Sequence, residues 1–189
     1  KGFAEVWWEA SALNRLVMDA LHEAGLPVIA FPPSACVIAR NGQVHSWDIT
    51  PIRKAMSQAL LPVIFGDVIF DSERGGTILS TEDLFEHLAH CLAPQHILLA
   101  GIEDGVWEDY PTCTKYISEI SPENYAQISG YLSGSNATDV TGGMASKVKQ
   151  SLALVQAVHG LEVMIFSAAK PGKLLDALTN HQGGTIVHG

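Results

Sequence analysis

Short apolar segments recur along this chain and alternate with stretches that carry apolar residues at helical spacing. The short segments read as buried strands, whereas the stretches between them repeat their apolar residues every three or four positions, as helices do. Buried strands that alternate with helices are typical of a largely parallel sheet covered by helices on both faces, so the sequence predicts an α/β fold. The expected strands are LPVIAF (26–31), LPVIF (61–65), HILLAG (96–101), EVMIFS (162–167) and TIVH (185–188).

Local signals place the helices between these strands. The first helix is expected over residues 7–24, where an apolar stripe includes Trp8 and Leu16, and Gly25 suits the left-handed residue that ends a helix. Asn41-Gly42 predicts a hairpin turn. The other expected helices run from Thr50-Pro51 to about Leu60, from Thr81 to about Cys91, from Ser121-Pro122, from Gly142-Gly143 to near Gly160, and over 173–178.

Length and composition limit the class of protein. A chain of 189 residues is long enough for one domain with a sizeable core, and we expect a single domain over 1–189. A formal net charge of -9 argues against a nucleic-acid surface, which needs a basic face. No apolar run is long enough to cross a membrane. The scattered cysteines, Cys36, Cys91 and Cys113, favour reduced thiols and a cytoplasmic location.

Glycines and acids gather where the expected strands pass into helices. In open α/β sheets, ligands bind beyond the carboxyl ends of the strands, so these junctions are candidate site segments. A glycine turn at one junction is common in any domain, but four such junctions together favour a ligand. They are Gly66-Asp67, GGTILSTED (75–83), IEDGVWEDYP (102–111) and DVTGG (139–143).

The segment DVTGGMASK (139–147) carries the most specific chemistry. Backbone N–H groups at a glycine-opened helix N-terminus suit an anion, and Lys147 follows on the first turn to neutralise a transferring phosphoryl group. A carboxylate such as Asp83 would hold Mg²⁺ or orient a lysine. Neither G-x-x-x-x-G-K-[ST] nor G-x-G-x-x-G occurs. The alternative interpretation makes Lys147 a solvated helix lysine and Asp83 a first-turn acid favoured by the helix dipole.

Four segments in order along the chain carry a family resemblance: 66–83, 97–107, 139–148 and 160–174. Together they resemble the amino acid kinase superfamily, most closely the isopentenyl phosphate kinases, with fosfomycin kinase a near relative. The resemblance implies an open, three-layer αβα sandwich. It also implies that residues 81–189 bind ATP with Mg²⁺ and that residues 1–80 form the remainder of the acceptor side.

The resemblance assigns roles to particular residues. It implies that Lys147 contacts the ATP phosphates and stabilises the transferring group, and that Asp83 organises the catalytic lysines and the metal. Gly66 and Asp67 resemble a G-D turn on the acceptor side. The implied nucleotide-binding residues are Asp104, Gly105, Gly142, Gly143, Lys147, Pro171 and Gly172.

Two departures from the family pattern stand out. The family often has T-D-V-D-G where this chain has Gly101-Ile102-Glu103-Asp104-Gly105, so an isoleucine replaces the first aspartate and Glu103 is the candidate to replace its contact. The family's K-x-G-G-S strand and G-G-G-S-F-G-H loop, which bring a lysine and an acceptor-binding histidine, do not occur. We therefore expect a fold without its N-terminal strands, from a truncated or incompletely represented chain.

Three functions remain open at this point. The leading hypothesis is an ATP-dependent kinase that converts isopentenyl phosphate to isopentenyl diphosphate. The second is a kinase of the same family with another acceptor: fosfomycin, another phosphonate or phosphate monoester, or carbamate. The third is a non-catalytic nucleotide-binding member. We expect a small-molecule acceptor, no nucleic-acid or membrane partner, and a homodimer. His87, His90 and Cys91 share one helix face, but no second ligand pair has zinc-site spacing, so we expect no metal site there.

Overall fold

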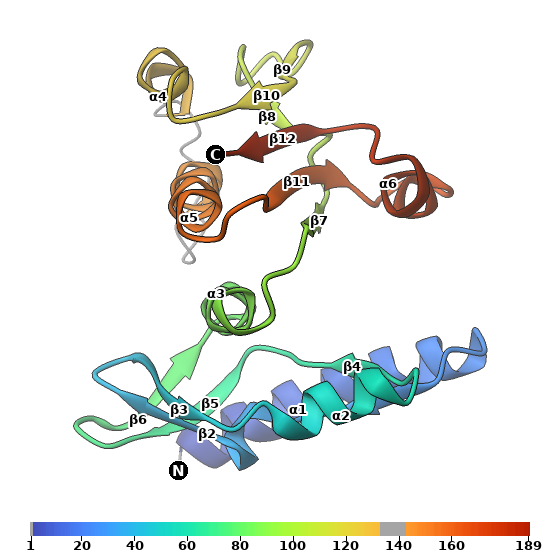
Figure 1. Ribbon diagram of the computed structural model, residues 1–189, viewed down its shortest axis with the longest axis vertical. Helices are drawn as coiled ribbons and strands as arrows, with labels where there is room; N and C mark the ends of the chain where they lie inside the picture. The colour runs from blue at the N-terminus through green and yellow to red at the C-terminus, as the bar shows by residue number, and fades with distance from the viewer. Residues whose placement is uncertain (1, 133–142) are drawn as a thin grey trace. The chain divides into compact units, whose positions relative to one another are not determined.

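The computed structural model describes residues 2–132 and 143–189. The chain divides into two compact units, unit 1 (Lys1–Leu88) and unit 2 (Ala89–Gly189). Figure 1 labels the elements of both units. The candidate residue Gly142, together with the rest of DVTG, lies outside the described residues.

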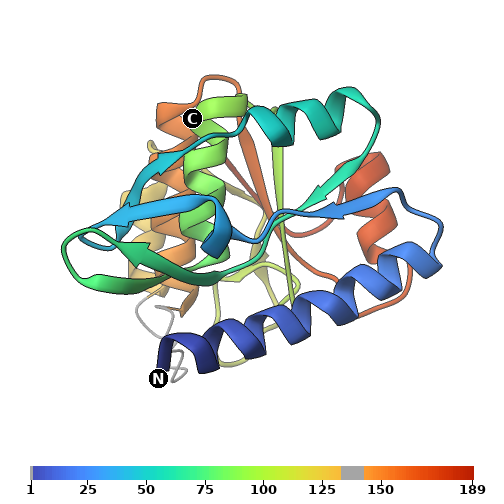
Figure 2. The ribbon, with the colours of Figure 1, turned by 90° about the horizontal axis from the view of Figure 1, so that it is seen from below.

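Unit 1 combines a long helix with short sheets. Strands β1 and β4 pair in parallel, and a second sheet has the order β3-β2-β5-β6, in which β2 and β5 are parallel and the two outer pairs are antiparallel hairpins. Figure 2 shows α1, the long blue helix, running beside the strands of this unit, where it contacts β1 and β5. The elements are α1 (Gly2–Glu23), β1 (Val28–Ala30), the 3-10 helix η1 (Pro33–Ala35), β2 (Val37–Arg40), β3 (Gln43–Trp47), α2 (Thr50–Ser57), β4 (Leu61–Val63), β5 (Asp67–Asp71), β6 (Gly75–Leu79) and the start of α3 (Thr81–Leu92).

Unit 2 is built on a sheet with the order β10-β12-β11-β7. Strands β7 and β11 are parallel, β12 is antiparallel to β11, and β10 is parallel to β12. A short hairpin, β8–β9, stands apart from this sheet. The elements are β7 (His96–Gly101), β8 (Val106–Trp107), β9 (Tyr116–Ile117), β10 (Glu119–Ile120), α4 (Tyr125–Leu132), α5 (Gly143–Ala157), β11 (Glu162–Ser167), α6 (Lys173–Asn180) and β12 (Thr185–His188).

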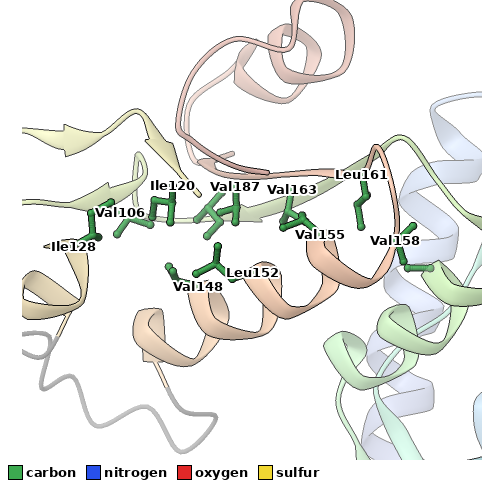
Figure 3. Packing of buried hydrophobic residues seen from close by; sticks show 12 residues of the cluster. Val106, Ile120, Ile128, Val148, Leu152, Val155, Val158, Leu161, Val163 and Val187 are labelled. Atoms are coloured by element: carbon green, nitrogen blue, oxygen red, sulfur yellow. The ribbon is translucent and has the colours of Figure 1, made fainter. Parts of the chain in front are cut away.

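The side chains of β11 alternate between two apolar layers. Val163 and Ile165 belong to the cluster that holds the buried face of α5, whereas Met164 and Phe166 pack with Ala177 of α6. Successive side chains of a strand point to opposite faces, so α5 and α6 cover opposite faces of the sheet. Figure 3 shows the α5 layer, with valines and a leucine of the helix directed at the strands. Unit 2 is therefore a three-layer α/β/α arrangement, and each fully buried aliphatic side chain contributes about 1.5–3 kcal/mol to its stability.

Several expected elements are confirmed. The strands at 96–101, 162–167 and 185–188 have the expected bounds, whereas the two strands of unit 1 are shorter. Asn41 and Gly42 both have positive φ (51° and 81°) between β2 and β3, as the predicted hairpin requires. Gly25 has φ 80° after α1.

Other expectations are wrong in instructive ways. The helix expected from Ser121-Pro122 begins only at Tyr125, because the Asn124 side chain accepts a hydrogen bond from the Ser121 N–H and closes a turn first. The helix from Thr50 ends at Ser57, and Ala59 beyond it has φ 58°. The glycines of GGTILSTED do not form a strand-to-helix junction, since Gly75 begins β6. The first helix begins at Gly2 rather than residue 7, and its apolar stripe is not buried: Trp8 is 67% exposed and Leu16 68%.

Candidate active site

The carboxyl ends of β7 and β11 form the edge of unit 2 where a ligand is expected. The two strands are parallel and in register, with Gly101 opposite Ser167. The Ala168 N–H donates to the Gly101 carbonyl (2.9 Å), which continues the pairing by one step. Both strands therefore deliver the chain to the same edge, β7 into Asp104-Gly105 and β11 into Pro171-Gly172.

The N-terminus of α5 lies at this same edge. Helix α5 connects to β11 through a short turn, and Figure 3 shows Val158 at the end of the helix beside Leu161 at the start of the strand. The helix runs back along the strand, so its first turn, with Gly143 and Lys147, lies near the strand's carboxyl end. Gly143 has φ 64°, a conformation that glycine adopts without a steric penalty, and Lys147 is half-buried. The structure thus brings six predicted residues to one edge: Asp104, Gly105, Gly143, Lys147, Pro171 and Gly172.

Gly105 has a packing role that its sequence context did not reveal. A Cβ atom at this position would lie 2.8 Å from the Thr185 Oγ1 and 3.0 Å from the Tyr116 ring. The adjacent Val106 N–H donates to the Thr185 hydroxyl (2.8 Å), which donates in turn to the Ile117 carbonyl (2.5 Å). The glycine therefore holds the loop after β7 tightly against β12 and β9, and the half-buried Asp104 stands next to this fixed point.

The isoleucine that replaces the family's first aspartate lies on the surface of this loop. Ile102 is 82% exposed. Glu103, the candidate replacement for the missing aspartate, accepts a hydrogen bond from the Trp107 indole N–H (2.6 Å). The carboxylate of Glu103 is thus engaged within its own loop.

The acceptor-side residues gather at the N-terminus of α3 in unit 1. The Gly66 N–H donates to the Thr81 hydroxyl (3.2 Å), and a Cβ on Gly66 would meet the Thr81 nitrogen and the Leu79 carbonyl oxygen at 3.3 Å. Asp67 pairs with Leu79 across β5 and β6 and is 1% exposed. Its carboxylate accepts hydrogen bonds from the Ser34 N–H (3.0 Å) and the Val68 N–H (2.8 Å). Gly66 and Asp67 are thus fixed against the first turn of α3.

Asp83 takes part in a capping box at the start of α3. Its Oδ2 accepts hydrogen bonds from the Ser80 N–H (2.9 Å) and the Ser80 hydroxyl (2.8 Å), while the Asp83 N–H donates to the Ser80 Oγ (3.1 Å). A serine and a carboxylate three residues apart satisfy in this way two N–H groups that a helix N-terminus leaves unpaired. The S-x-x-D spacing in the sequence carries this signal. The role in ordering catalytic lysines remains a prediction.

Asp71 is a buried carboxylate that holds two hairpins of unit 1 together. It is 4% exposed and accepts hydrogen bonds from the N–H groups of Asn41 (3.1 Å), Gly42 (2.7 Å), Glu73 (2.8 Å) and Arg74 (2.9 Å). Loss of water raises the pKa of the Asp71 carboxyl, but these four donors outweigh it and lower the pKa to about 2. The carboxylate joins the tips of the β2–β3 and β5–β6 hairpins.

The described residues contain neither a metal-ligand cluster nor a membrane-spanning helix. Within 2–132 and 143–189, no three His, Cys, Asp or Glu side chains converge as a metal site. His87 is one of three potential metal ligands that share a helix face in the sequence. Its ring stacks on Trp47 with ring centroids 5.7 Å apart. None of the described helices is long and apolar enough to span a membrane. Within the described residues, Cys36, Cys91 and Cys113 form no disulfide bond.

The α/β fold carries a glycine-opened helix and a lysine at the carboxyl edge of the unit 2 sheet, an arrangement that suits phosphoryl transfer. The sequence pattern of the amino acid kinase family matches residues 8–167, and the chain belongs to that family. The predicted α/β fold class is confirmed, since solved structures of the family have the same fold.

Three relatives illustrate the similarity. The isopentenyl phosphate kinase of Methanothermobacter thermautotrophicus is 32% identical over 191 aligned residues, which cover 100% of this chain and 71% of the relative. That of Methanocaldococcus jannaschii is 33% identical over 187 residues, 99% of this chain and 68% of the relative. A solved structure of isopentenyl phosphate kinase superposes with a TM-score of 0.80 at 29% identity, over 98% of this chain and 69% of the other.

Proposed function

We propose that this protein transfers the γ-phosphoryl group of ATP to isopentenyl phosphate, giving isopentenyl diphosphate and ADP. The observation that carries the proposal is the similarity to isopentenyl phosphate kinases along practically the whole chain, at 32–33% identity in two archaeal relatives. The six predicted residues at the carboxyl edge of unit 2 support it, because phosphoryl transfer depends mainly on positioning and on neutralising charge.

In the proposed mechanism, unit 2 binds the nucleotide. Backbone N–H groups at the glycine-opened start of α5, at Gly142 and Gly143, bind phosphate oxygens. Lys147, on the first turn of α5, places its ammonium group against the transferring phosphoryl group and stabilises the negative charge of the transition state. Asp104-Gly105 and Pro171-Gly172 line the nucleotide from the loops after β7 and β11.

Unit 1 contributes the acceptor side in this proposal. Gly66 and Asp67 present backbone to the acceptor phosphate, and the close approach of Gly66 to Thr81 supports a rigid turn at this point. Asp83 acts as a positioning residue, because its capping box with Ser80 fixes the first turn of α3 beside Gly66. The resemblance assigns Asp83 the further task of organising the lysines, which remains to be tested.

We propose that Mg²⁺ enters with ATP. Magnesium sites of this kind use one or two carboxylates together with substrate phosphates and water, so a dedicated cluster of protein ligands is not required. Asp104 is the half-exposed carboxylate at the unit 2 edge and fits this role. When bound, the ion neutralises phosphate charge during transfer.

A homodimer and a cytoplasmic location complete the proposal. Exposed apolar side chains on α1, including Trp8, Leu13 and Leu16, support burial of this helix in a subunit interface. The three cysteines, which form no disulfide among the described residues, support a reducing compartment. Sedimentation equilibrium tests the dimer directly, and a monomer at micromolar concentration would rule it out.

Release of ADP from ATP and Mg²⁺ tests the function, with isopentenyl phosphate, fosfomycin, carbamate and glutamate compared as acceptors and a no-acceptor control. Glutamate belongs in the panel because a glutamate 5-kinase of Corynebacterium glutamicum is 35% identical over 103 residues, which cover 53% of this chain. We expect the highest kcat/KM with isopentenyl phosphate. Preference for another acceptor would replace the substrate, and ATP binding without turnover of any acceptor would favour a non-catalytic member.

A further inference from the structure

Thr185, the first residue of β12, closes the base of the β8–β9 hairpin. Its buried hydroxyl accepts a hydrogen bond from the Val106 N–H (2.8 Å) and donates one to the Ile117 carbonyl (2.5 Å). Val106 and Ile117 are register partners in the hairpin, so one hydroxyl joins both hairpin strands to β12. The next residue supports the same junction, because the Ile186 N–H donates to the Ser118 carbonyl (2.9 Å). A hydroxyl is both donor and acceptor, and Thr185 uses both capacities here.

Thr185 is also fixed by its own strand. It pairs with Ile165 of β11 and is 0% exposed. Immediately before it, Gly184 has φ 84°, and a Cβ on this glycine would lie 2.2 Å from the Ile165 carbonyl oxygen. Only glycine fits at this point, so the chain enters β12 in one position. The Thr185 hydroxyl is therefore a fixed point against which the loop after β7 is placed.

The loop after β7 is attached at two points, with Asp104 between them. At its start, Gly101 is the last residue of β7 and is paired with β11. At its end, the Val106 N–H is bound by the Thr185 hydroxyl. Only residues 102–105 lie between the two attachments. So short a segment has little freedom while both ends are held, and loss of the second attachment would let Asp104 move.

We propose that Thr185 is a positioning residue that sets the affinity for ATP through the loop after β7. Both hydrogen bonds of the Thr185 hydroxyl go to backbone groups, so it acts on the loop and not on the ligand. Binding geometry of the required precision depends on such supporting hydrogen bonds behind the groups that meet the ligand. This inference rests on the proposed function, in which Asp104 and Gly105 line the nucleotide.

Calorimetric titration with ATP in the presence of Mg²⁺ tests the proposal. Thr185→Val keeps the branched shape but leaves the Val106 N–H and the Ile117 carbonyl unpaired, so the Kd for ATP should rise about tenfold. Thr185→Ser keeps the hydroxyl and should bind ATP within about twofold of the parent. The matched control Val187→Ala removes buried apolar contacts from the same strand; it should lower Tm and leave the Kd for ATP within about twofold.

Hydrogen–deuterium exchange of the ligand-free protein supplies a readout that does not depend on the nucleotide. In Thr185→Val, the Val106 amide should exchange at least about tenfold faster relative to the amides of β11, because only its own acceptor is lost. A general loss of stability would accelerate both sets equally, as expected for Val187→Ala. If Thr185→Val does not fold, Thr185→Cys replaces it, since a thiol forms only weak hydrogen bonds, and the Kd for ATP should rise at least about threefold.

The outcomes separate this inference from the proposed function. A Kd for ATP within twofold of the parent value in the variant that lacks the hydroxyl would overturn the positioning role and leave the proposed function intact. An equal rise in Val187→Ala, or a tenfold rise in Thr185→Ser, would overturn it as well. ATP binding that depends on the Thr185 hydroxyl, without transfer to isopentenyl phosphate, retains the positioning role and removes the acceptor. No ATP binding by the parent protein removes both.

Discussion

Three carboxylates of unit 1 and two lysines of unit 2 differ in how their charges are paired. In unit 1, Asp67, Asp71 and Asp83 each accept at least two hydrogen bonds from groups of their own unit, so their carboxylates hold turns and a helix start in place. At the unit 2 edge, Lys170 and Lys173 are not paired with any described carboxylate. Saturated charges stabilise a fold, and unsaturated charges remain available to a ligand. The comparison distinguishes charged groups that stabilise the fold from charged groups that remain available for binding.

The largest effect is expected in unit 2, at Lys147. The variant Lys147→Ala should lower kcat at least ~100-fold, the scale of losing one transition-state stabiliser, while the protein remains folded. ADP release measures kcat, and circular dichroism checks the fold. Lys149→Ala, two residues along the same helix and exposed, is the control. Near-normal turnover in Lys147→Ala would contradict the proposed role.

The largest loss of stability is expected in unit 1, at Asp71. Replacement by alanine leaves four N–H donors without their acceptor, and Tm should fall by several degrees. The folded pKa of about 2 lies below the ordinary 3.8, so Asp71 stabilises the fold above pH 4 and this contribution disappears as pH falls toward 2. Asp48→Asn, at an exposed acid that accepts one backbone hydrogen bond from Thr50, should change Tm little. Equal Tm values for the two variants would refute the stabilising role of the hydrogen bonds between Asp71 and the two hairpin tips.

A smaller loss of stability is expected at Gly105. Alanine places a Cβ against Thr185 and Tyr116, and overpacking of this kind costs about 1–3 kcal/mol. Chemical denaturation measures the free energy of unfolding. Gly130→Ala, inside α4 with no atom within 4 Å of the added Cβ, should be neutral or stabilising. An unchanged free energy of unfolding in Gly105→Ala would mean that the loop after β7 shifts freely.

The smallest effect separates two roles of Asp83. Ser80→Ala and Asp83→Asn should each cost about 1 kcal/mol through the broken capping box. Ordering of the catalytic lysines, as the resemblance implies, should make kcat of Asp83→Asn at least about tenfold lower than kcat of Ser80→Ala. Similar kcat values in the two variants would restrict Asp83 to capping.

The strands of unit 2 were predicted well from the sequence, whereas the exposure of α1 in unit 1 was not. Apolar runs such as 162–167 have the right length for strands, and burial on both faces gives them an unmistakable pattern. The apolar stripe of α1 was equally regular, yet Trp8 and Leu16 are exposed, because periodicity identifies a helix but not what covers it. The two-residue strands between Val106 and Ile120 are too short to carry any period.

Site residues were predictable where a local motif carried them. DVTGGMASK predicted Gly143 and Lys147, which lie in the first five residues of α5, and the family resemblance predicted the loops; the roles of all these residues stay predictions. The uses of Asp71 and Gly105 were not predictable, because each depends on partners far along the chain: Asp71 on Asn41, and Gly105 on Thr185.

The hydrogen bonds that join two hairpin tips to the Asp71 carboxylate have a consequence for motion. A single carboxylate accepts hydrogen bonds from the backbone N–H groups of residues 41, 42, 73 and 74, so these four amides are expected to open together. In hydrogen–deuterium exchange they should behave as one cooperative group, with a common opening free energy, although more than thirty residues separate Asn41 from Arg74 along the chain. The tips of two hairpins would then unfold as one event, with the carboxylate setting its frequency.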